Sequence, residues 1–315
     1  LKDGVGATKK FAFESFVNGR HPLLLDLYFR RQTRMLLADQ ERKKSMTYAE
    51  IEAEIGRDFE SVFRHKLNWD NPQTYNEKIN VSKLYMPSPL KTRLADKIAV
   101  REWITEKIGS EYLIPLLGVY DSFDEIDFDA LPDKFVMKCN HDSNSVTICT
   151  DKSKLDMKFL RRKYEWHMKQ NFAYMGFEMH YRDIKPKIII EQFMGEAIND
   201  YKFTCLNREP IFCWIDFDRY GKHKRNVYNM SWEIQPFNKG LLENTDYKCE
   251  CPTNFDDMKR IVKTLCEDFE QVRVDLYLIE GKIYFGEMTF TGANGFSPFT
   301  PDEWDYKLGA LWPFD

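Results

Sequence analysis

Two predicted β-hairpins constrain the fold of this chain more than any other feature. Residues 201–206 and 211–217 are apolar segments joined by a short polar turn, and residues 272–279 and 283–290 form a second pair of the same kind. Short apolar segments on both sides of a turn rich in Asn, Gly and Pro are typical of antiparallel hairpins. The chain is therefore expected to contain at least one antiparallel sheet.

Helical patterns alternate with these strands. Thr74 is followed by Glu77, the spacing of a capping box, and it predicts a helix start within the helical region 70–110. A further helix is expected between the hairpins, over about residues 254–269. Antiparallel strands with helices packed on them predict an α+β fold. Additional short strands are expected at residues 114–120, 135–138, 146–149 and 188–194.

Composition excludes several classes of protein. The 315 residues carry a net charge of −4, whereas a non-specific nucleic-acid binder is usually basic, so no nucleic-acid partner is expected. No apolar run approaches the roughly 18 residues that would span a bilayer. The seven scattered cysteines and the lack of a visible signal peptide predict a reduced, cytoplasmic protein.

The second hairpin contains a candidate metal site. Asp275 and Glu287 lie within strand-like apolar runs, where a buried carboxylate needs a partner, and paired carboxylates suit Mg²⁺. Two solvent-facing strand positions remain the alternative. Side chains alternate faces along a strand, so a two-residue turn at Glu280-Gly281 would separate the carboxylates. We therefore expect a three-residue loop, 279–281, with Gly281 left-handed and both carboxylates on one face.

Two polar segments have the residue types of a nucleotide site. Lys138 ends a predicted strand and precedes a loop of small polar residues, 139–145, that could hold phosphates, although it contains no glycine. The strand end 191–194 exposes backbone groups that could read an adenine edge, and Asp200 and Lys202 follow within reach of a ribose and phosphates. A plain surface loop is the favoured explanation of the first pattern, and an edge strand with a solvated hairpin explains the second equally well.

Two further patterns are weaker. Arg225 ends a basic run, 222–225, that is either a solvated loop or an anion clamp. Asp216-Phe217-Asp218 resembles the metal motif of many sugar-nucleotide glycosyltransferases, but this tripeptide is common by chance.

Several ordered blocks resemble one family. From about residue 70 to 312 the chain resembles the ATP-grasp superfamily, and closely its TupA-like branch, which is named after teichuronopeptide biosynthesis. The resemblance implies an ATP-grasp fold in which two α+β lobes sandwich a nucleotide. The blocks that carry it are 71–78, 94–97, 134–141, 190–193, 200–203, 223–226, 272–277 and 285–291.

The resemblance also implies roles for individual residues, with ATP and Mg²⁺ as cofactors. Arg273 would lie over the transferring phosphoryl group, and Asp275, Glu287 and Thr289 would hold Mg²⁺, although relatives usually have Asn where this chain has Thr289. The residues expected around the nucleotide are Lys97 and Lys138 at the phosphates, Glu191, Gln192, Phe193 and Met194 at the adenine, Asp200 at the ribose and Lys202 near the phosphates.

One loop departs from the family pattern. Relatives usually have a glycine-rich turn after the histidine that matches His141, but here Asp142-Ser143-Asn144-Ser145 takes its place. Asp142 would bring negative charge near the phosphates, which predicts weakened ATP binding or a degenerate site.

The expected activity is that of a carboxylate–amine ligase. ATP would convert a substrate carboxylate to an acyl phosphate, and an amine would then displace phosphate to give an amide. Arg273, Lys202 and Arg225 are the expected catalytic cations, and His141 is a candidate base, although a structural histidine is the more common case. A glycosyltransferase that uses Asp216-Phe217-Asp218 and a non-catalytic nucleotide- or glycan-binding module are the alternatives.

The family branch further implies the substrates and partners. The carboxylate would belong to a uronic acid of a cell-surface glycan or to a sugar-nucleotide precursor, and the amine would be an amino acid or a small amine. A peripheral association with polysaccharide assembly machinery is compatible with this role. The expected organisation is a helical region at 1–69, the N-terminal lobe of the ligase at 70–132, and the nucleotide- and metal-binding lobes at 133–315.

Overall fold

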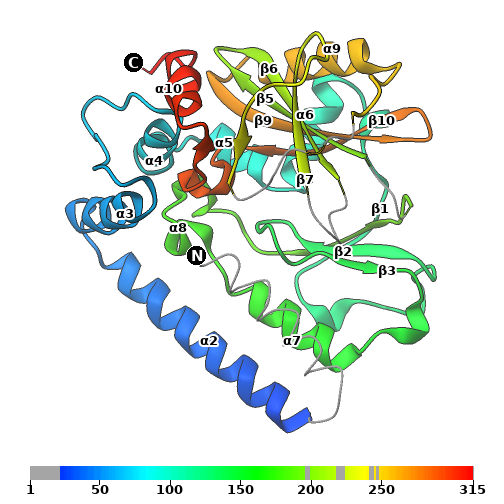
Figure 1. The fold of residues 1–315 in the computed structure, drawn as a ribbon. Helices are drawn as coiled ribbons and strands as arrows, with labels where there is room; N and C mark the ends of the chain where they lie inside the picture. Colours follow the sequence, from blue (N-terminus) through cyan, green and yellow to red (C-terminus); the bar gives the residue numbers. More distant parts are fainter. Residues whose placement is uncertain (1–21, 196–198, 218–223, 241–244, 246–247, 315) are drawn as a thin grey trace.

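The computed structural model describes residues 22–195, 199–217, 224–240, 245 and 248–314, and it confirms the α+β prediction with two antiparallel sheets surrounded by helices (Figure 1). The helices are α2 (Pro22–Lys44), α3 (Tyr48–Phe63), α4 (Tyr75–Tyr85), α5 (Pro89–Ala95), α6 (Ala99–Lys107), α7 (Met157–His167), α8 (Phe172–Met175), α9 (Phe255–Cys266) and α10 (Glu303–Ala310). The strands are β1 (Leu116–Tyr120), β2 (Phe135–Cys139), β3 (Thr147–Cys149), β4 (Ile188–Gln192), β5 (Asn199–Leu206), β6 (Glu209–Phe217), β7 (Lys224–Asn229), β8 (Asn238–Lys239), β9 (Gln271–Ile279), β10 (Lys282–Thr289) and β11 (Phe299–Thr300).

The smaller of the two main sheets has the strand order β1-β4-β2-β3. Phe135, Met137 and Ile190 are buried on one of its faces and share a core with Leu160 and Tyr164 of α7. Because side chains alternate along a strand, Lys138 of β2 and Glu191 of β4 point to the opposite face. One face of this sheet thus anchors a helix, and the other carries charge.

The larger sheet has the strand order β10-β9-β5-β6-β7 and divides its two faces in the same way. Val272, Val274 and Leu276 of β9 are buried in a core that also contains Met258 and Val262 of α9. The alternate positions of β9 and of its neighbours are polar, and cross-strand pairing puts Lys202, Asp275 and Glu287 side by side in one row. The apolar face therefore stabilises the sheet, while the other face gathers charged groups.

The hairpin loop of β9 and β10 differs from the prediction. Ile279 pairs with Lys282, so the turn has two residues, Glu280 and Gly281, both with positive φ (50° and 76°). That turn alone would put Asp275 and Glu287 on opposite faces, but a β-bulge between Phe285 and Glu287 shifts the register by one residue. Glu287 consequently pairs with Asp275. The expected shared face and left-handed Gly281 are confirmed, whereas the expected three-residue loop is wrong.

Helix α4 has the capping box predicted from the sequence: the Thr74 side chain accepts a bond from the Glu77 amide, and Glu77 accepts one from the Thr74 amide. It is buried along nearly its whole length. Asn80 and Lys83 donate to the carbonyl oxygens of Gly295 (3.0 Å) and Asn294 (3.0 Å). Helix α4 thus holds the segment that follows β10.

Thr300 and Glu303 also have the spacing of a capping box, which predicts a helix that begins directly after Thr300, and this prediction is wrong. Thr300 lies in β11 instead of capping the last helix, and α10 begins at Glu303 without a side-chain cap bond. Its Lys307 and Glu303 are paired on the surface instead.

Helices α2 and α3 form the described part of the predicted helical region, and α2 lies alongside α7 and α8 (Figure 1). The boundaries at residues 69 and 132 stay a prediction, although β1 and β2, on either side of residue 132, belong to the same sheet. None of the described helices combines the length and the apolar composition that crossing a membrane requires.

Two glycines should respond in opposite ways to alanine. Gly281→Ala is expected to destabilise the protein by about 1 kcal/mol, because Gly281 has φ +76° in the hairpin turn. Gly56→Ala is expected to stabilise it by about 0.4–1 kcal/mol, because Gly56 lies within α3 with open space around its Cα. Urea unfolding of the two variants measures both changes, and equal shifts would contradict the assigned turn.

Candidate active site

A cavity of about 300 Å³ lies between the two main sheets. Its wall combines the charged face of the small sheet, the polar face of the large sheet and the start of α6. The charged and polar residues that line it are Lys97, Arg101, Lys138, Asp142, Ser143, Glu178, Tyr181, Glu191, Arg273, Tyr277, Glu287, Thr289, Thr291 and Asn294. The cavity thus collects residues from blocks that are up to about two hundred positions apart in the sequence.

Arg273 joins the two carboxylates of the predicted metal site. Its Nε and Nη2 atoms donate to Asp275 at 2.6 and 2.8 Å, and Nη2 also donates to Glu287 at 2.7 Å. One oxygen of each carboxylate therefore converges on the same nitrogen atom. The hydroxyl of Thr289 donates to the same Glu287 oxygen at 3.2 Å.

These carboxylates fit a magnesium ion. Burial raises the pKa of Asp275 to about 6, against the opposing charges of Arg273 and Lys202. Burial would also raise the pKa of Glu287, but Arg273, Lys97 and Lys202 outweigh it and lower that pKa. Two convergent hard oxygen donors with an excess of negative charge suit a divalent cation. In the described part of the chain, no cluster of three or more His, Cys, Asp or Glu side chains supplies further ligands of these types.

The two predicted phosphate-facing lysines both line the cavity. Lys138 pairs with Glu191 at 2.6 Å, and Arg101 of α6 lies 3.8 Å from the other oxygen of Glu191. Lys97 donates to the carbonyl oxygen of Asp142, and its own amide donates to the Asn140 carbonyl (3.1 Å). The region around Glu191 therefore carries more positive than negative charge.

The acidic side chain of the glycine-free loop is held by partners within the protein. The carboxylate of Asp142 is almost fully buried, lies 2.6 Å from Nδ1 of His167 and accepts a hydrogen bond from the hydroxyl of Ser145 (2.5 Å). Burial would raise the pKa of Asp142, but these partners outweigh it and lower that pKa. The carboxylate thus has its own partners in the loop and at the end of α7, and the predicted effect on ATP binding stays a prediction.

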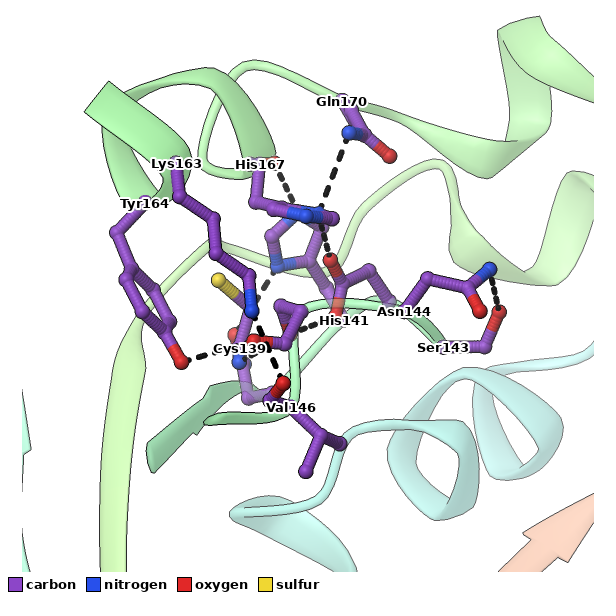
Figure 2. A network of polar contacts seen from close by, with 12 residues as sticks. Cys139, His141, Ser143, Asn144, Val146, Lys163, Tyr164, His167 and Gln170 are labelled. Carbon is purple, nitrogen blue, oxygen red and sulfur yellow. Dashed lines mark hydrogen bonds and ion pairs between the residues drawn. The ribbon is translucent and has the colours of Figure 1, made fainter. Parts of the chain in front are cut away.

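Side chains of helix α7 also hold this loop in place. Figure 2 shows Lys163 and Tyr164 reaching from α7 toward the strand that leads into the loop, with Ser143 and Asn144 at the far end of the network. Tyr164 contacts the Ser145 carbonyl oxygen at 2.8 Å, and Lys163 donates to the Val146 carbonyl oxygen at 2.9 Å. Side-chain bonds therefore fix a turn that relatives are expected to form with glycine.

A second group of ion pairs lies on the polar face of the large sheet. Lys202 pairs with Asp200 and lies 3.4 Å from Asp216, while Arg225 Nε lies 2.5 Å from Asp216. None of these four side chains is among those that line the cavity. Asp216 is engaged by two cations, and Asp218 lies outside the described residues, so the glycosyltransferase alternative gains no support.

Other predicted site residues do not reach the cavity. His141 is buried and contacts Asn140 Oδ1 (3.3 Å) and the His167 carbonyl oxygen (3.2 Å), contacts that suit a structural histidine, while its catalytic role stays a prediction. Gln192, Phe193 and Met194 follow Glu191 along the chain but are not among the residues that line the cavity, so their predicted adenine contacts stay a prediction.

Sequence reasoning missed Arg101, Glu178 and Tyr181 in the cavity wall. Arg101 lies in the region 70–110 that the sequence predicts as helical, but no pattern singled it out. Glu178 and Tyr181 lie at a short helical turn, residues 179–181, between α8 and β4, where no pattern singled them out. These three residues reach the cavity only through the tertiary fold, which the pattern of a single segment does not show.

Comparison with known families fits this geometry. The family model described as TupA-like ATPgrasp matches residues 77–312. The chain belongs to the TupA-like ATP-grasp family. This confirms the resemblance and the expected ATP-grasp fold, with its cavity between two α+β lobes.

Solved structures that are similar to the chain include several ligases. An L-amino acid ligase from Bacillus licheniformis matches with 13% identity and TM-score 0.43, covering 78% of this chain and 56% of that one. Phosphoribosylamine–glycine ligase from Thermotoga maritima matches with 13% identity and TM-score 0.43, covering 71% and 58%. A D-alanine–D-alanine ligase from Helicobacter pylori matches with 12% identity and TM-score 0.38, covering 70% and 61%. The chain thus matches little more than half the length of each protein, and no curated protein sequence matches it.

The buried pair of the glycine-free loop generates a prediction. Asp142→Asn is expected to cost about 2–3 kcal/mol of stability and to weaken binding of a non-hydrolysable ATP analogue, because it breaks a buried charged contact that orients the loop. Asp124→Asn, which breaks the exposed pair with Arg161, should cost less than about 1 kcal/mol and leave nucleotide binding unchanged. Urea unfolding and calorimetric titration measure both, and an Asp142→Asn protein as stable as wild type would contradict the assigned network.

Proposed function

We propose that this protein is an ATP-dependent carboxylate–amine ligase that forms an amide through an acyl phosphate. The observation that carries the proposal is the convergence on one cavity of Lys97, Lys138, Arg273 and Glu287, with Asp275 bound to Arg273 behind the cavity wall. Phosphoryl transfer needs cations around the phosphates and a carboxylate-bound metal, and little else from the protein.

The residues of the cavity have distinct roles in this reaction. A carboxylate oxygen of the substrate attacks the γ-phosphorus of ATP, the bond to the bridging oxygen breaks, and ADP leaves. Lys97 and Lys138 neutralise the phosphates, and Arg273 stabilises the charge that develops on the transferred group. Asp275 and Glu287, with Thr289 as a weaker third ligand, would hold Mg²⁺, which would add positive charge at the phosphates. The amine then attacks the carbonyl carbon, and phosphate leaves.

The substrates follow from the family branch. The proposed carboxylate belongs to a uronic acid, either in a cell-surface polysaccharide or in its sugar-nucleotide precursor, and the proposed amine is an amino acid or a small amine. Membership in the TupA-like family supports this class of substrate by analogy only. A cytoplasmic location and an association with polysaccharide assembly proteins belong to the same proposal.

One assay tests the activity. The protein is incubated with ATP, Mg²⁺, glucuronic or galacturonic acid or their nucleotide-linked forms, and ethanolamine or amino acids. The expected result is ADP release that depends on the carboxylate, with a product whose mass equals that of the two substrates less one water. Sugar-nucleotide turnover without ADP would favour a glycosyltransferase, and nucleotide binding without turnover would favour a non-catalytic module.

Lys138→Ala is expected to lower kcat/KM for ADP release by at least about 100-fold, because it removes a charge at the phosphates. Lys154→Ala is the control and should leave turnover unchanged, because Lys154 is an exposed lysine paired with Asp151 on the surface. Near-normal turnover in Lys138→Ala would remove Lys138 from the site.

Arg273→Lys should also lower kcat by at least about tenfold, since lysine cannot reproduce the planar fork that contacts both carboxylates. The control is Arg260→Lys, which changes an exposed ion pair with Asp257 on α9. Full activity in Arg273→Lys would assign Arg273 a purely structural role.

A further inference from the structure

Glu178 is a buried carboxylate in the cavity that the proposed phosphoryl transfer does not use. It is 8% exposed and directly precedes the short helical turn 179–181. The residue before it, Phe177, has φ +59°, a left-handed conformation that is unusual for an aromatic side chain. Backbone strain of this kind persists only where the surrounding structure enforces it, so the position of Glu178 is tightly determined.

The segment that follows β10 holds this carboxylate. The hydroxyl of Thr291 donates to Glu178 Oε2. Two residues further on, Ala293 and Asn294 have positive φ (51° and 54°), and Lys83 fixes Asn294 through its side-chain oxygen at 2.9 Å. Glu178 is therefore attached to the same segment that α4 anchors.

Among the described residues, no cationic side chain forms a direct ion pair with Glu178. Lys83 of α4 acts on it electrostatically, but the two side chains form no direct ion pair, and Lys83 is bound to Asn294. Burial raises the pKa of Glu178 to about 7 and lowers the pKa of Lys83 to about 7. A carboxyl group that titrates near neutral pH can both release and accept a proton under working conditions.

Among the carboxylates that line the cavity in the described residues, Glu178 differs from the others. Glu191 is paired with Lys138, and Glu287 with Arg273, whereas Asp142 is held by His167 and Ser145. Glu178 receives its hydrogen bond from Thr291, an uncharged group. A buried carboxylate in this state attracts a cation and repels the substrate carboxylate and the phosphates.

Glu178 lines the same cavity as the proposed reaction centre, together with Arg273 and Glu287. Its partner Thr291 is followed by Gly292, where a Cβ atom would lie 3.9 Å from Nη1 of Arg273. Tyr181 lines the cavity as well, and its pKa is raised, first by burial and then by the negative charges of Glu178 and Glu287. The segment that holds Glu178 thus continues towards the arginine assigned to the transferred phosphoryl group.

We propose that Glu178 forms the amine subsite of the ligase: its carboxylate binds the ammonium group of the incoming amine and takes one proton from it. This inference rests on the proposed function. The ammonium loses a proton to Glu178, and the free amine attacks the carbonyl carbon of the acyl phosphate. The carbon–oxygen bond to phosphate then breaks, and the second proton leaves with the phosphate. The expected amine is small and carries an ammonium group beside polar hydrogen-bonding atoms.

Binding of small amines tests the subsite without knowledge of the sugar. Ethanolamine, L-serine and ethylene glycol are titrated calorimetrically into protein saturated with a non-hydrolysable ATP analogue and Mg²⁺. Ethanolamine or L-serine should bind wild type, and ethylene glycol, which lacks the ammonium, should not. Glu178→Gln is expected to weaken amine binding at least about tenfold, because it removes the buried charge.

Control variants separate this effect from misfolding and from general charge. Thr291→Val removes only the hydroxyl that orients Glu178 and should weaken amine binding less than Glu178→Gln does. Glu102→Gln removes an exposed carboxylate of α6, paired with Arg93, and should leave amine binding unchanged. Equal amine affinity in Glu178→Gln and wild type, or no amine binding by a wild type that binds the nucleotide, would overturn the subsite. Failure of wild type to bind the nucleotide would instead reject the proposed function.

The proton-accepting role has a kinetic test that uses a carboxylate supporting ADP release. Hydroxylamine is largely uncharged at neutral pH, so it can attack an acyl phosphate without a proton acceptor. Glu178→Gln should keep hydroxamate formation near the wild-type rate and lose about 100-fold in amide formation from ethanolamine. An equal loss of both products would show that Glu178 does not act on the amine.

Discussion

The contact of Arg273 with both Asp275 and Glu287 is the interaction on which the site depends. The three side chains come from two neighbouring strands and share one face of the large sheet. A buried carboxylate such as Asp275 is costly unless a cation compensates it, and Arg273 supplies this compensation. The polar face is therefore stable only as a paired network, and any ligand that binds there must replace partners within it.

Helix α4 extends this organisation beyond the sheets. Asn76, Asn80 and Lys83 recur at helical spacing and contact successive residues of the segment 294–297. On another side of the helix, Lys78 donates to the carbonyl oxygens of Gly309 and Trp312. The first block of the family resemblance, residues 71–78, thus begins a helix that positions one wall of the cavity. The contacts of Asn76 and Lys78 give these two polar residues of the block a structural role.

The sequence predicted what depends on local pattern and on residue type. The hairpins, the capping box of Thr74 and the shared face of the paired carboxylates are confirmed, because each follows from a short stretch of chain. Lys97 was expected from the family resemblance, and it lines the cavity together with Lys138. The bulge at Gly286 could not be foreseen, since it depends on how β10 fits against β9, where a Cβ atom would lie 3.0 Å from the Asp275 carbonyl oxygen. The prediction counted only the residues of the turn. It therefore placed both carboxylates on the correct face, but it did so by assuming a three-residue loop that the hairpin does not have.

Residues whose roles depend on distant partners escaped sequence reasoning altogether. Asp142 was expected to bring negative charge to the phosphates. The sequence of its own strand and loop could not predict that His167, at the end of α7, lies 2.6 Å from its carboxylate. Glu178 was not singled out, because its significance arises from Thr291 and Arg273, more than ninety residues away. Burial and pairing are tertiary properties, and the pattern of a single segment contains no information about them.

The paired clusters also determine which ligand charge each part of the cavity can accept. Around Glu191, Lys138 and Arg101 supply one more cation than there are carboxylates, so this region attracts phosphates. Around Arg273, Asp275 and Glu287 supply one more carboxylate than there are directly bound cations, and under the proposed function this region would hold a metal ion. Glu178 lines the same cavity and forms no direct ion pair with a cationic side chain among the described residues. In the proposed reaction a nucleotide would occupy the first region, a divalent ion the second, and the ammonium group of the amine would bind at Glu178.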